Sequence, residues 1–269
     1  MVQIVTRFLS LQRFASLLGL VSLCAALPVQ AQITTELSFQ APPVGSPGNR
    51  EAGSGRSDTC AALTEQAGLT AIVPETNVGL TSQATPELFA YIPTNNAAFA
   101  ELRLLKEATG EDVYVSQVSM PAATTPGFAH KASILSLDLP ATVTLEPGEN
   151  YLWALMLVCN ANNRAEDIVV TAVVQRADNG YLNTLPAEVS RQLDGVDTAS
   201  PSEKLSIYSS AGLWQDLLAQ LSTLTTADPA TYEAVWSDLL TSQGLGAIAD
   251  APLYESQITT LTSGARLPQ

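Results

Sequence analysis

Short apolar runs, several of them alternating with polar residues, fill the chain between residues 69 and 176. Runs of this length, with Pro or Gly between them, indicate β-strands. Seven are present: residues 69–73, 88–92, 100–104, 113–115, 135–139, 152–158 and 167–175. No amphipathic helix separates these runs, which excludes a Rossmann-type alternation and favours an antiparallel β-sandwich.

The stretch 145–159 organises this region. Pro147 and Gly148 predict a turn, and Cys159 closes the stretch. Residues 152–158 are apolar throughout, which is typical of a strand buried on both faces. We expect the opposing sheet to cover one face of this strand and the C-terminal helices to cover the other.

The beginning of the same stretch resembles a tyrosine corner. Leu145, Pro147, Gly148 and Tyr151 stand at the spacing seen in immunoglobulin-like and fibronectin type III domains. In those domains the tyrosine hydroxyl bonds to the backbone a few residues upstream. Cys159 departs from the antibody pattern because it follows Tyr151 by eight residues rather than two.

After residue 176 the apolar residues recur at helical spacing. Ser200, Pro201 and Glu203 form a helix start with a capping residue, Pro at the first position and Glu at the third. A second start follows at Asp228 and Pro229. The apolar stripes are Ile207, Ala211, Trp214, Leu218 and Leu221 on the first helix, and Tyr232, Val235, Trp236, Leu239 and Leu240 on the second.

Together these patterns predict a mostly β fold with C-terminal α structure. The expected architecture is an immunoglobulin/fibronectin-like antiparallel β-sandwich, followed by a helical hairpin packed on it. Trp153, Trp214 and Trp236 lie on the predicted apolar faces, so we interpret them, with Tyr151, as structural residues.

The N-terminus has the pattern of a cleaved signal peptide. Arg7 and Arg13 precede an apolar run at residues 14–27, and small residues at Val29 and Ala31 place the cleavage after Ala31. The alternatives are an uncleaved anchor and a lipid anchor at Cys24. The predicted organisation is 1–31 signal peptide, 32–59 Pro/Gly-rich extended lead-in, 60–176 β-sandwich, 177–254 helical C-terminal subdomain and 255–269 flexible tail.

Charge and cysteine content add to this picture. The formal net charge of −14 disfavours binding to nucleic acid, and no transmembrane segment is expected after signal cleavage. With the predicted signal peptide, we expect export to the periplasm, the extracellular space or the cell envelope.

Cys60 and Cys159 remain after the leader is removed, and an oxidising compartment predicts a disulfide between them. Two free thiols or a metal site are the alternatives.

Candidate chemistry is sparse. His130, the only histidine, lies in a loop without a recognisable nucleophile, so we interpret it as an exposed loop residue. Residues 160–167 are rich in the oxygen groups that calcium prefers but lack the glycine and glutamate spacing of an EF-hand, so we interpret them as a solvated loop with a calcium site as the alternative. The three tryptophans offer a sugar-stacking platform as an alternative to core packing, and no pair of catalytic carboxylates stands out. No catalytic, cofactor-binding or metal-binding residues are predicted.

Ordered motifs along the mature chain resemble a family of exported cyanobacterial proteins catalogued as domain of unknown function 928. The matching pieces are Pro42-Pro43-x-Gly45-x-Pro47-Gly48-x-Arg50, Ala52-Gly53-x-x-Arg56, Cys60, Leu69-Thr70-Ala71-x-Val73-Pro74, Leu145-Glu146-Pro147-Gly148, Tyr151, Trp153, Cys159 and Ala211-Gly212-x-Trp214-x-Asp216-x-Leu218. The resemblance implies export and this architecture. It brings no activity and no functional residues.

We therefore expect an exported, non-enzymatic binding or structural module that binds a protein or envelope partner. The alternatives are an envelope hydrolase acting on glycan or peptide, and a carbohydrate-binding, lectin-like domain. Two carboxylates about 5–10 Å apart in one cleft would favour the hydrolase, and a row of exposed tryptophans would favour sugar binding. An exposed apolar patch of roughly several hundred Å² would favour a protein partner.

Overall fold

The computed structural model describes residues 37–45, 50–52, 60 and 67–260. The predicted signal peptide at 1–31 lies outside the described residues, as do parts of the lead-in. The strands are β1 (Thr70–Ala71), β2 (Val78–Thr81), β3 (Glu87–Ile92), β4 (Phe99–Lys106), β5 (Asp112–Val118), β6 (Ser133–Asp138), β7 (Asn150–Val158), β8 (Ile168–Arg176), β9 (Leu253–Glu255) and β10 (Ile258–Thr260). They form a four-stranded sheet, β1-β3-β6-β9, and a six-stranded sheet, β10-β5-β4-β7-β8-β2.

The core between the two sheets follows from strand alternation. In β7, Trp153, Leu155 and Leu157 point inward and are fully buried. Leu88 and Ala90 of β3 face them from the other sheet. Burying each large apolar side chain contributes about 1.5–3 kcal/mol relative to leaving it in water, so this interior is the main source of stability.

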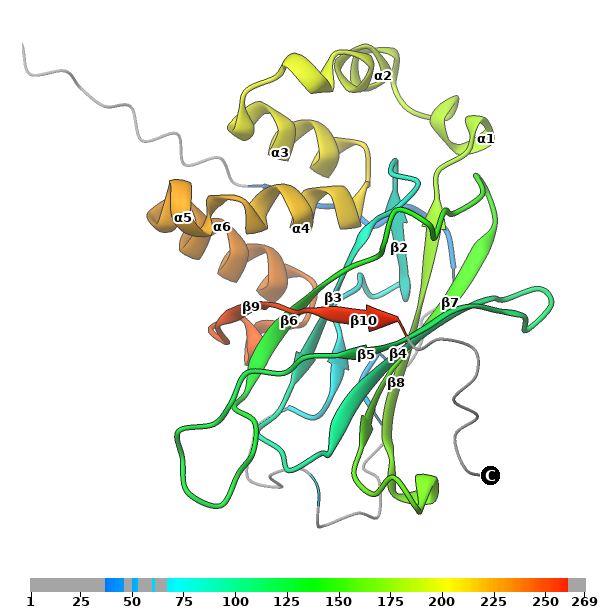
Figure 1. Cartoon of the computed structure of the whole chain (residues 1–269). Coiled ribbons are helices and arrows are strands. Elements are labelled where there is room, and N and C mark those ends of the chain that lie inside the picture. The colour runs from blue at the N-terminus through cyan, green and yellow to red at the C-terminus, as the bar shows by residue number, and fades with distance from the viewer. Residues whose placement is uncertain (1–36, 46–49, 53–59, 61–66, 261–269) are drawn as a thin grey trace, which may run out of the picture. The chain divides into compact units, whose positions relative to one another are not determined.

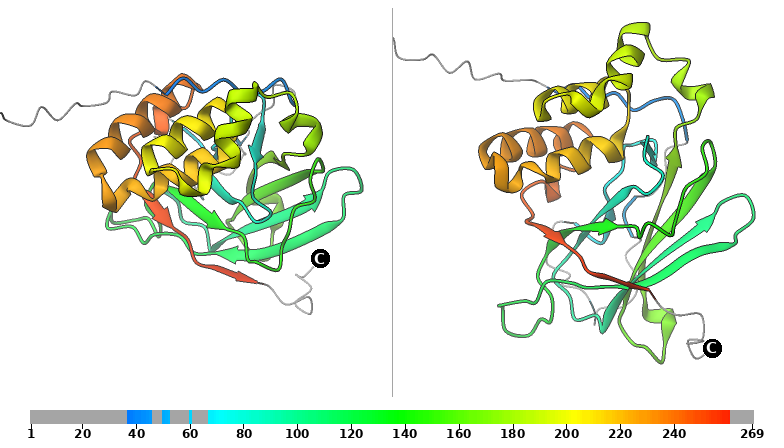
Figure 2. Two further views of the ribbon diagram at one scale, coloured as in Figure 1. Left: turned by 90° about the horizontal axis from the view of Figure 1, so that it is seen from above. Right: turned by 45° about the horizontal axis from the view of Figure 1, so that its top comes forward.

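The helices form a third layer. They are α1 (Asn179–Leu182), α2 (Ala187–Asp194), α3 (Pro201–Ser210), α4 (Trp214–Ser222), α5 (Leu224–Ala227) and α6 (Pro229–Ser242), with short 3-10 turns at Arg164–Glu166, Val196–Thr198 and Gly246–Ile248. Phe89, Tyr91 and Ile134 on the outer face of the four-stranded sheet pack against α4 and α6. Figures 1 and 2 show the helices gathered on one side of the sheets.

The predicted helix starts are confirmed, but the first helix is shorter than predicted. Ser200 and Glu203 form a capping box on α3, and the Asp228 side chain caps α6. The stripe from Ile207 to Leu221 is not one helix, because Gly212 adopts φ +67° and separates α3 from α4. The predicted hairpin is therefore a larger helical layer.

The helices cover the second face of β7 only in part. Leu152 on that face joins an apolar cluster with Tyr181 of α1 and Val189 of α2, whereas Ala154 is half-buried. Helices α4 and α6 instead cover the four-stranded sheet, whose outward positions Phe89 and Tyr91 are apolar. A continuous apolar run in the sequence therefore does not predict which sheet the helices pack against.

The sheets are mixed rather than purely antiparallel. β2 pairs with β8 in parallel, and β9 pairs with β6 in parallel. Residues 253–260 cross between the sheets, because β9 joins the four-stranded sheet and β10 pairs with β5 of the six-stranded sheet. The predicted flexible tail at 255–269 is therefore wrong for residues 255–260, which are strand or connection.

The described part of the lead-in packs against the rest of the chain. The Phe39 and Trp214 rings meet edge to face, with centroids 4.8 Å apart. Residues 50–52 run beside β1, where the Ala52 amide donates to Leu69 O at 2.8 Å. The lead-in thus contributes to both the helical layer and the sheet edge.

Candidate functional site

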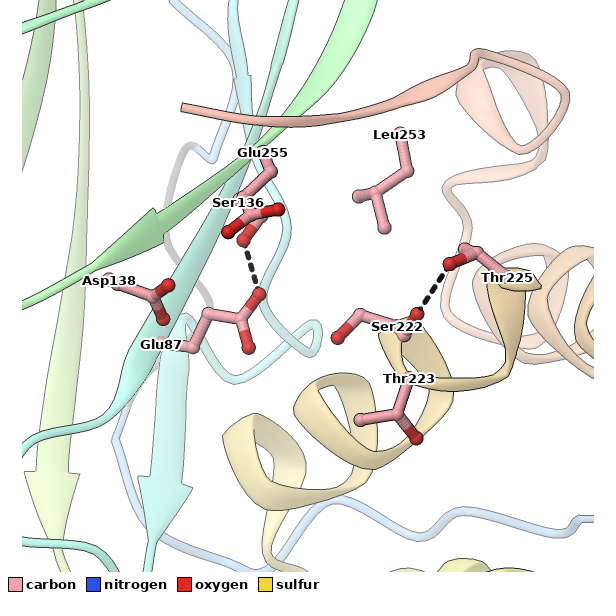
Figure 3. A pocket seen from close by; sticks show the side chains of 8 residues that line it. All are labelled: Glu87, Ser136, Asp138, Ser222, Thr223, Thr225, Leu253 and Glu255. Carbon is pink, nitrogen blue, oxygen red and sulfur yellow. Dashed lines mark hydrogen bonds between the residues drawn. The ribbon is translucent and has the colours of Figure 1, made fainter. Parts of the chain in front are cut away.

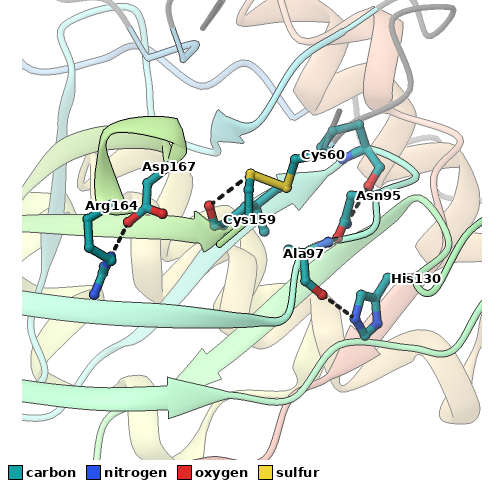
Figure 4. The surroundings of a disulfide bond; sticks show 9 residues. Cys60, Asn95, Ala97, His130, Cys159, Arg164 and Asp167 are labelled. Atoms are coloured by element: carbon teal, nitrogen blue, oxygen red, sulfur yellow. Dashed lines mark hydrogen bonds and ion pairs between the residues drawn. A yellow bond between two sulfur atoms is a disulfide. The ribbon is translucent and has the colours of Figure 1, made fainter. Parts of the chain in front are cut away.

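The predicted disulfide between Cys60 and Cys159 is confirmed (Figure 4). Their Cα atoms lie 5.4 Å apart, within the range that a disulfide requires. The Cys60 carbonyl accepts a hydrogen bond from the Asn96 amide at 2.7 Å, just before β4 begins. The bond therefore joins the lead-in to the end of β7 and has a structural role.

Tyr151 makes the contact that its sequence motif predicts. Its hydroxyl accepts a hydrogen bond from the Glu146 amide at 3.1 Å, five residues upstream. The ring is buried at the start of β7. Gly148 turns the chain between the two residues with φ +80°. This geometry anchors the turn at the start of β7.

The three tryptophans are all buried and do not form an exposed platform. Trp153 and Trp214 have no exposed surface, and Trp236 is 2% exposed. The Trp214 indole N–H donates to Ile72 O at 2.9 Å, which fastens α4 to β1. Trp236 packs against Phe89 with ring centroids 6.1 Å apart. The structure therefore gives no support to a sugar-stacking row.

Two other candidate features serve local structure. His130 is half-buried rather than exposed, and its Nε2 lies 3.2 Å from Ala97 O. In the oxygen-rich loop, the Arg164 guanidinium pairs with Asp167 and Glu101. The Arg164 guanidinium therefore balances the charge of Asp167, and the Glu166 carboxylate accepts a hydrogen bond from the Asn163 side chain at 2.6 Å.

A cleft between the four-stranded sheet and the helices is lined mainly by carboxyl and hydroxyl side chains. Its volume is about 360 Å³. It is lined by Glu87 of β3, Ser136 and Asp138 of β6, Leu253 and Glu255 of β9, and Ser222, Thr223 and Thr225 where α4 meets α5. Figure 3 shows the carboxylates on the sheet side and the three hydroxyls on the helix side.

Strand register brings the carboxylates together. Glu87 lies directly opposite Asp138, and Ser136 lies directly opposite Glu255. The Glu87 and Asp138 pair lies between antiparallel strands, where opposite residues have Cβ atoms about 4.5–5.5 Å apart. All four residues share the face that packs under the helices further along the strands. The helix-facing surface of the sheet therefore changes from apolar to acidic at one end.

The environment of the cleft favours the neutral form of two of its acids, Glu87 and Asp138. Burial raises the pKa of Glu87 to about 7, opposed by the hydrogen bond from the Ser136 hydroxyl and reinforced by Asp138 and Glu255. Burial, and then the charge of Glu255, raise the pKa of Asp138. Among the residues that the structure describes, no Lys, Arg or His lines the cleft. Near neutral pH the cleft can therefore hold a proton, and it presents acceptors to a ligand.

The helix side of the cleft is a wall of hydroxyl groups. The Ser222 hydroxyl donates to Ala219 O at 2.8 Å, and the Thr225 hydroxyl donates to Ser222 O at 2.8 Å. These contacts fix the side chains beside the α4–α5 junction. The hydroxyl oxygens keep acceptor capacity toward the cleft, so both walls offer hydrogen-bond acceptors to a donor ligand.

A second hollow adjoins the first. It measures about 290 Å³ and shares Leu253 with the acidic cleft. Tyr232 and Trp236 of α6 line it, with ring centroids 5.4 Å apart, beside Glu233 and Asp250. An acidic surface therefore continues past Leu253 toward an aromatic one.

The cleft was not predicted from the sequence. Its carboxylates come from three strands that are distant in the chain, and each is an ordinary polar residue at a strand end. Glu255 fell in the region predicted to be a tail. The available signal was the alternation of residues 87–92, which places Glu87 on the same face as Phe89 and Tyr91.

The family model described as Domain of Unknown Function (DUF928) matches residues 50–253. The chain belongs to the DUF928 family. The match includes Glu87, Ser136 and Asp138 of the cleft, and it ends before Glu255. The DUF928 assignment supports the resemblance noted from the motifs and supplies no activity.

Curated proteins and solved structures add no information about function. No curated protein matches the chain. A solved structure described as "Structure of Astrotactin-2, a conserved vertebrate-specific and perforin-like membrane protein involved in neuronal development" is 14% identical, with a TM-score of 0.25. The similarity covers 64% of this chain and 30% of that chain. At that score it carries no argument about function.

The described residues include neither a candidate metal site nor a helix that could span a membrane. No group of three or more His, Cys, Asp or Glu side chains within them is arranged to hold a metal ion. None of the helices in this part of the chain combines the length and apolar character needed to span a bilayer.

Proposed function

We propose that this DUF928 protein is an exported, non-enzymatic binding module that uses the acidic cleft to hold a positively charged segment of an envelope protein. The observation that carries the proposal is the cleft itself. Three carboxylates from adjacent strands face a wall of hydroxyls, and the described part of the chain places no basic side chain in the lining. Charge complementarity of this kind selects partners and accelerates their association.

The acidity of the whole chain supports the same class of partner. The formal net charge is −14, so a basic segment is attracted over a distance and an acidic one is repelled. The adjoining hollow at Tyr232 and Trp236 offers apolar contact to residues that flank the charged group. Export is supported by the N-terminal pattern and by the Cys60–Cys159 disulfide.

The test is a calorimetric titration with a lysine-rich peptide at low ionic strength. In the variant Asp138→Asn/Glu255→Gln we expect the affinity to fall about tenfold or more, because two carboxylates lose their charge. Glu149→Gln/Asp194→Asn is the matched control, since it removes the same charge from two exposed positions outside the cleft. Equal losses in both variants, or no binding to the wild-type protein, would contradict the proposal.

A second candidate function is glycan or peptide hydrolysis. One feature favours it: Glu87 lies opposite Asp138, and burial raises the pKa of Glu87 to about 7. Acid–base catalysis needs a carboxyl that is protonated near neutral pH. Glu87 would be the proton donor and Asp138 the second carboxylate. Purified protein that cleaves envelope glycan or peptide, and loses this activity in Glu87→Gln, would replace the binding module with an enzyme.

A further inference from the structure

The last described segment, residues 253–260, holds the two sheets together and is here called the strap. It carries β9 into one sheet and β10 into the other. The Ile134 amide donates to Pro252 O at 2.9 Å, and the Ser256 amide donates to Ser136 O at 3.0 Å. On the other sheet, the Ser119 amide donates to Gln257 O at 2.9 Å.

The strap is a short edge element with a limited set of contacts. Each of its strands pairs through three residues, and both strands lie at the edge of their sheets. Leu253, Tyr254 and Ile258 supply its apolar contacts, and all three are only half-buried. Edge elements with few buried contacts open more easily than the body of a domain.

The strap also brings a negative charge to the acidic cleft. Glu255 of β9 lies opposite Ser136, next to the Glu87 and Asp138 pair. The groups that face Glu87 are Ser136 and Asp138 from β6, Glu255 from β9, and the uncharged Ser222, Thr223 and Thr225 from the α4–α5 junction. No cation among them offsets the charge. Ionisation of the cluster therefore repels the strap from the strand that holds it.

We propose that the strap is a pH-sensitive closure, which docks while the Glu87, Asp138 and Glu255 cluster holds a proton and loosens when the cluster ionises. The consequence is a sandwich whose edge, and whose acidic cleft, open toward neutral and alkaline pH. This inference goes beyond the proposed binding function and does not depend on it, because the strap opens and closes without a ligand.

The direction of the pH dependence follows from linkage. The pKa of Glu87 is about 7 in the folded protein, raised mainly by burial from the ordinary value of 4.5. Leu253 and Glu255 of the strap line the cleft that holds Glu87, so opening of the strap increases the exposure of this carboxyl to water. The pKa of Glu87 then falls toward its ordinary value, and the open state binds fewer protons than the closed state between these two values. The closed state is therefore most favoured in acid, and this preference is lost as the pH rises through about 7.

Hydrogen exchange followed by mass spectrometry tests the proposal on the full mature protein. Exchange rates of peptides covering 253–260 are measured between pH 5 and pH 8 and divided by the intrinsic rates. We expect protection to fall up to about tenfold per pH unit between pH 5 and pH 7 and to level off above pH 7. Peptides from β3 and β7 serve as the internal reference and should change much less.

Three variants distinguish the effect of the acidic cluster on strap protection from effects of pH on the rest of the protein. Glu87→Gln should flatten the pH dependence, and Glu255→Gln should increase strap protection at pH 8. Glu255 is exposed on the strap, so that variant remains informative if Glu87→Gln fails to fold. Glu149→Gln, an exposed acid elsewhere, should behave as the wild type. Strap protection that is independent of pH, that falls equally in the β3 and β7 peptides, or that keeps its pH dependence in both cluster variants would overturn the proposal.

Discussion

At the scale of single residues, buried polar atoms mark positions where a small chemical change has a measurable effect. Tyr151 is such a position, because its ring fills the core while its hydroxyl accepts the Glu146 amide. A hydrogen bond of this kind contributes about 1 kcal/mol net. It holds the turn at Gly148 against the start of β7.

The variant Tyr151→Phe isolates that hydrogen bond, since it keeps the ring. We expect the free energy of unfolding to fall by about 1 kcal/mol, measured by urea denaturation. Tyr208→Phe is the matched control, because the Tyr208 ring is half-buried and no hydrogen bond is found for its hydroxyl among the described residues. A loss in the control as large as in Tyr151→Phe would refute this role.

The role of a residue could be predicted from the sequence where its type or its spacing was enough to indicate that role. The disulfide between Cys60 and Cys159 could be predicted because these are the two cysteines outside the predicted leader, and an oxidising compartment favours a disulfide over two free thiols. The burial of Trp153, Trp214 and Trp236 followed from periodicity. Glu87 and Asp138 were not recognised, because a carboxylate at a strand end is common on solvated surfaces and acquires its character only from its neighbours.

At the scale of elements, Gly212 divides the helical layer. Its φ of +67° ends α3 and lets α4 start in a new direction. A Cβ atom at this position would lie 2.7 Å from the Tyr181 hydroxyl, which donates to Ala211 O at 2.7 Å. Both the backbone conformation and the space therefore require glycine.

Gly212→Ala and Gly110→Ala form a matched pair, because Gly110 has the same φ of +67° and no neighbour within 4 Å of the added Cβ. Both variants carry the left-handed strain of about 1–2 kcal/mol. We expect Gly212→Ala to lose about 1–3 kcal/mol more, because the Tyr181 contact must move. Thermal or urea unfolding measures the difference. Equal losses would show that the close approach is unimportant.

The same glycine explains one error in the predicted elements. The apolar stripe continues through Ala211 and Trp214, so spacing alone predicts a single helix. The seven predicted strands were found, because each carries its own alternation or apolar run. β2, β9 and β10 were missed because they are short and are stabilised by partners that are distant in the chain, which local pattern does not reveal.

At the scale of the whole molecule, the disulfide closes a large loop. Cys60 and Cys159 are 99 residues apart and enclose most of the sandwich. The chain-entropy model assigns about 4–5 kcal/mol to a loop of this size. The bond is therefore a major share of the stability of a single domain.

Cys60→Ala/Cys159→Ala should lower the free energy of unfolding by up to about 4–5 kcal/mol while preserving the native circular dichroism spectrum in buffer. Reduction of the wild-type protein should reproduce the effect. Unchanged stability in both experiments would mean that the sandwich core alone sets the stability.

The class of fold was predictable at this scale, and the site was not. Two sheets with C-terminal helices follow from the change of periodicity near residue 176. The cleft requires the register of three strands and the seating of α4 and α5 above them. These are properties of the assembled layers, so no local motif marks Glu87, Asp138 and Glu255 as neighbours.

The most direct test of the central claim is NMR chemical-shift mapping with a lysine-rich peptide at low ionic strength. If the cleft binds positively charged segments, the amides of Glu87, Ser136, Asp138 and Glu255 and those of residues 222–225 shift together on titration. Shifts confined to other surfaces, or no shifts at all, would contradict the assignment of this cleft as the binding site.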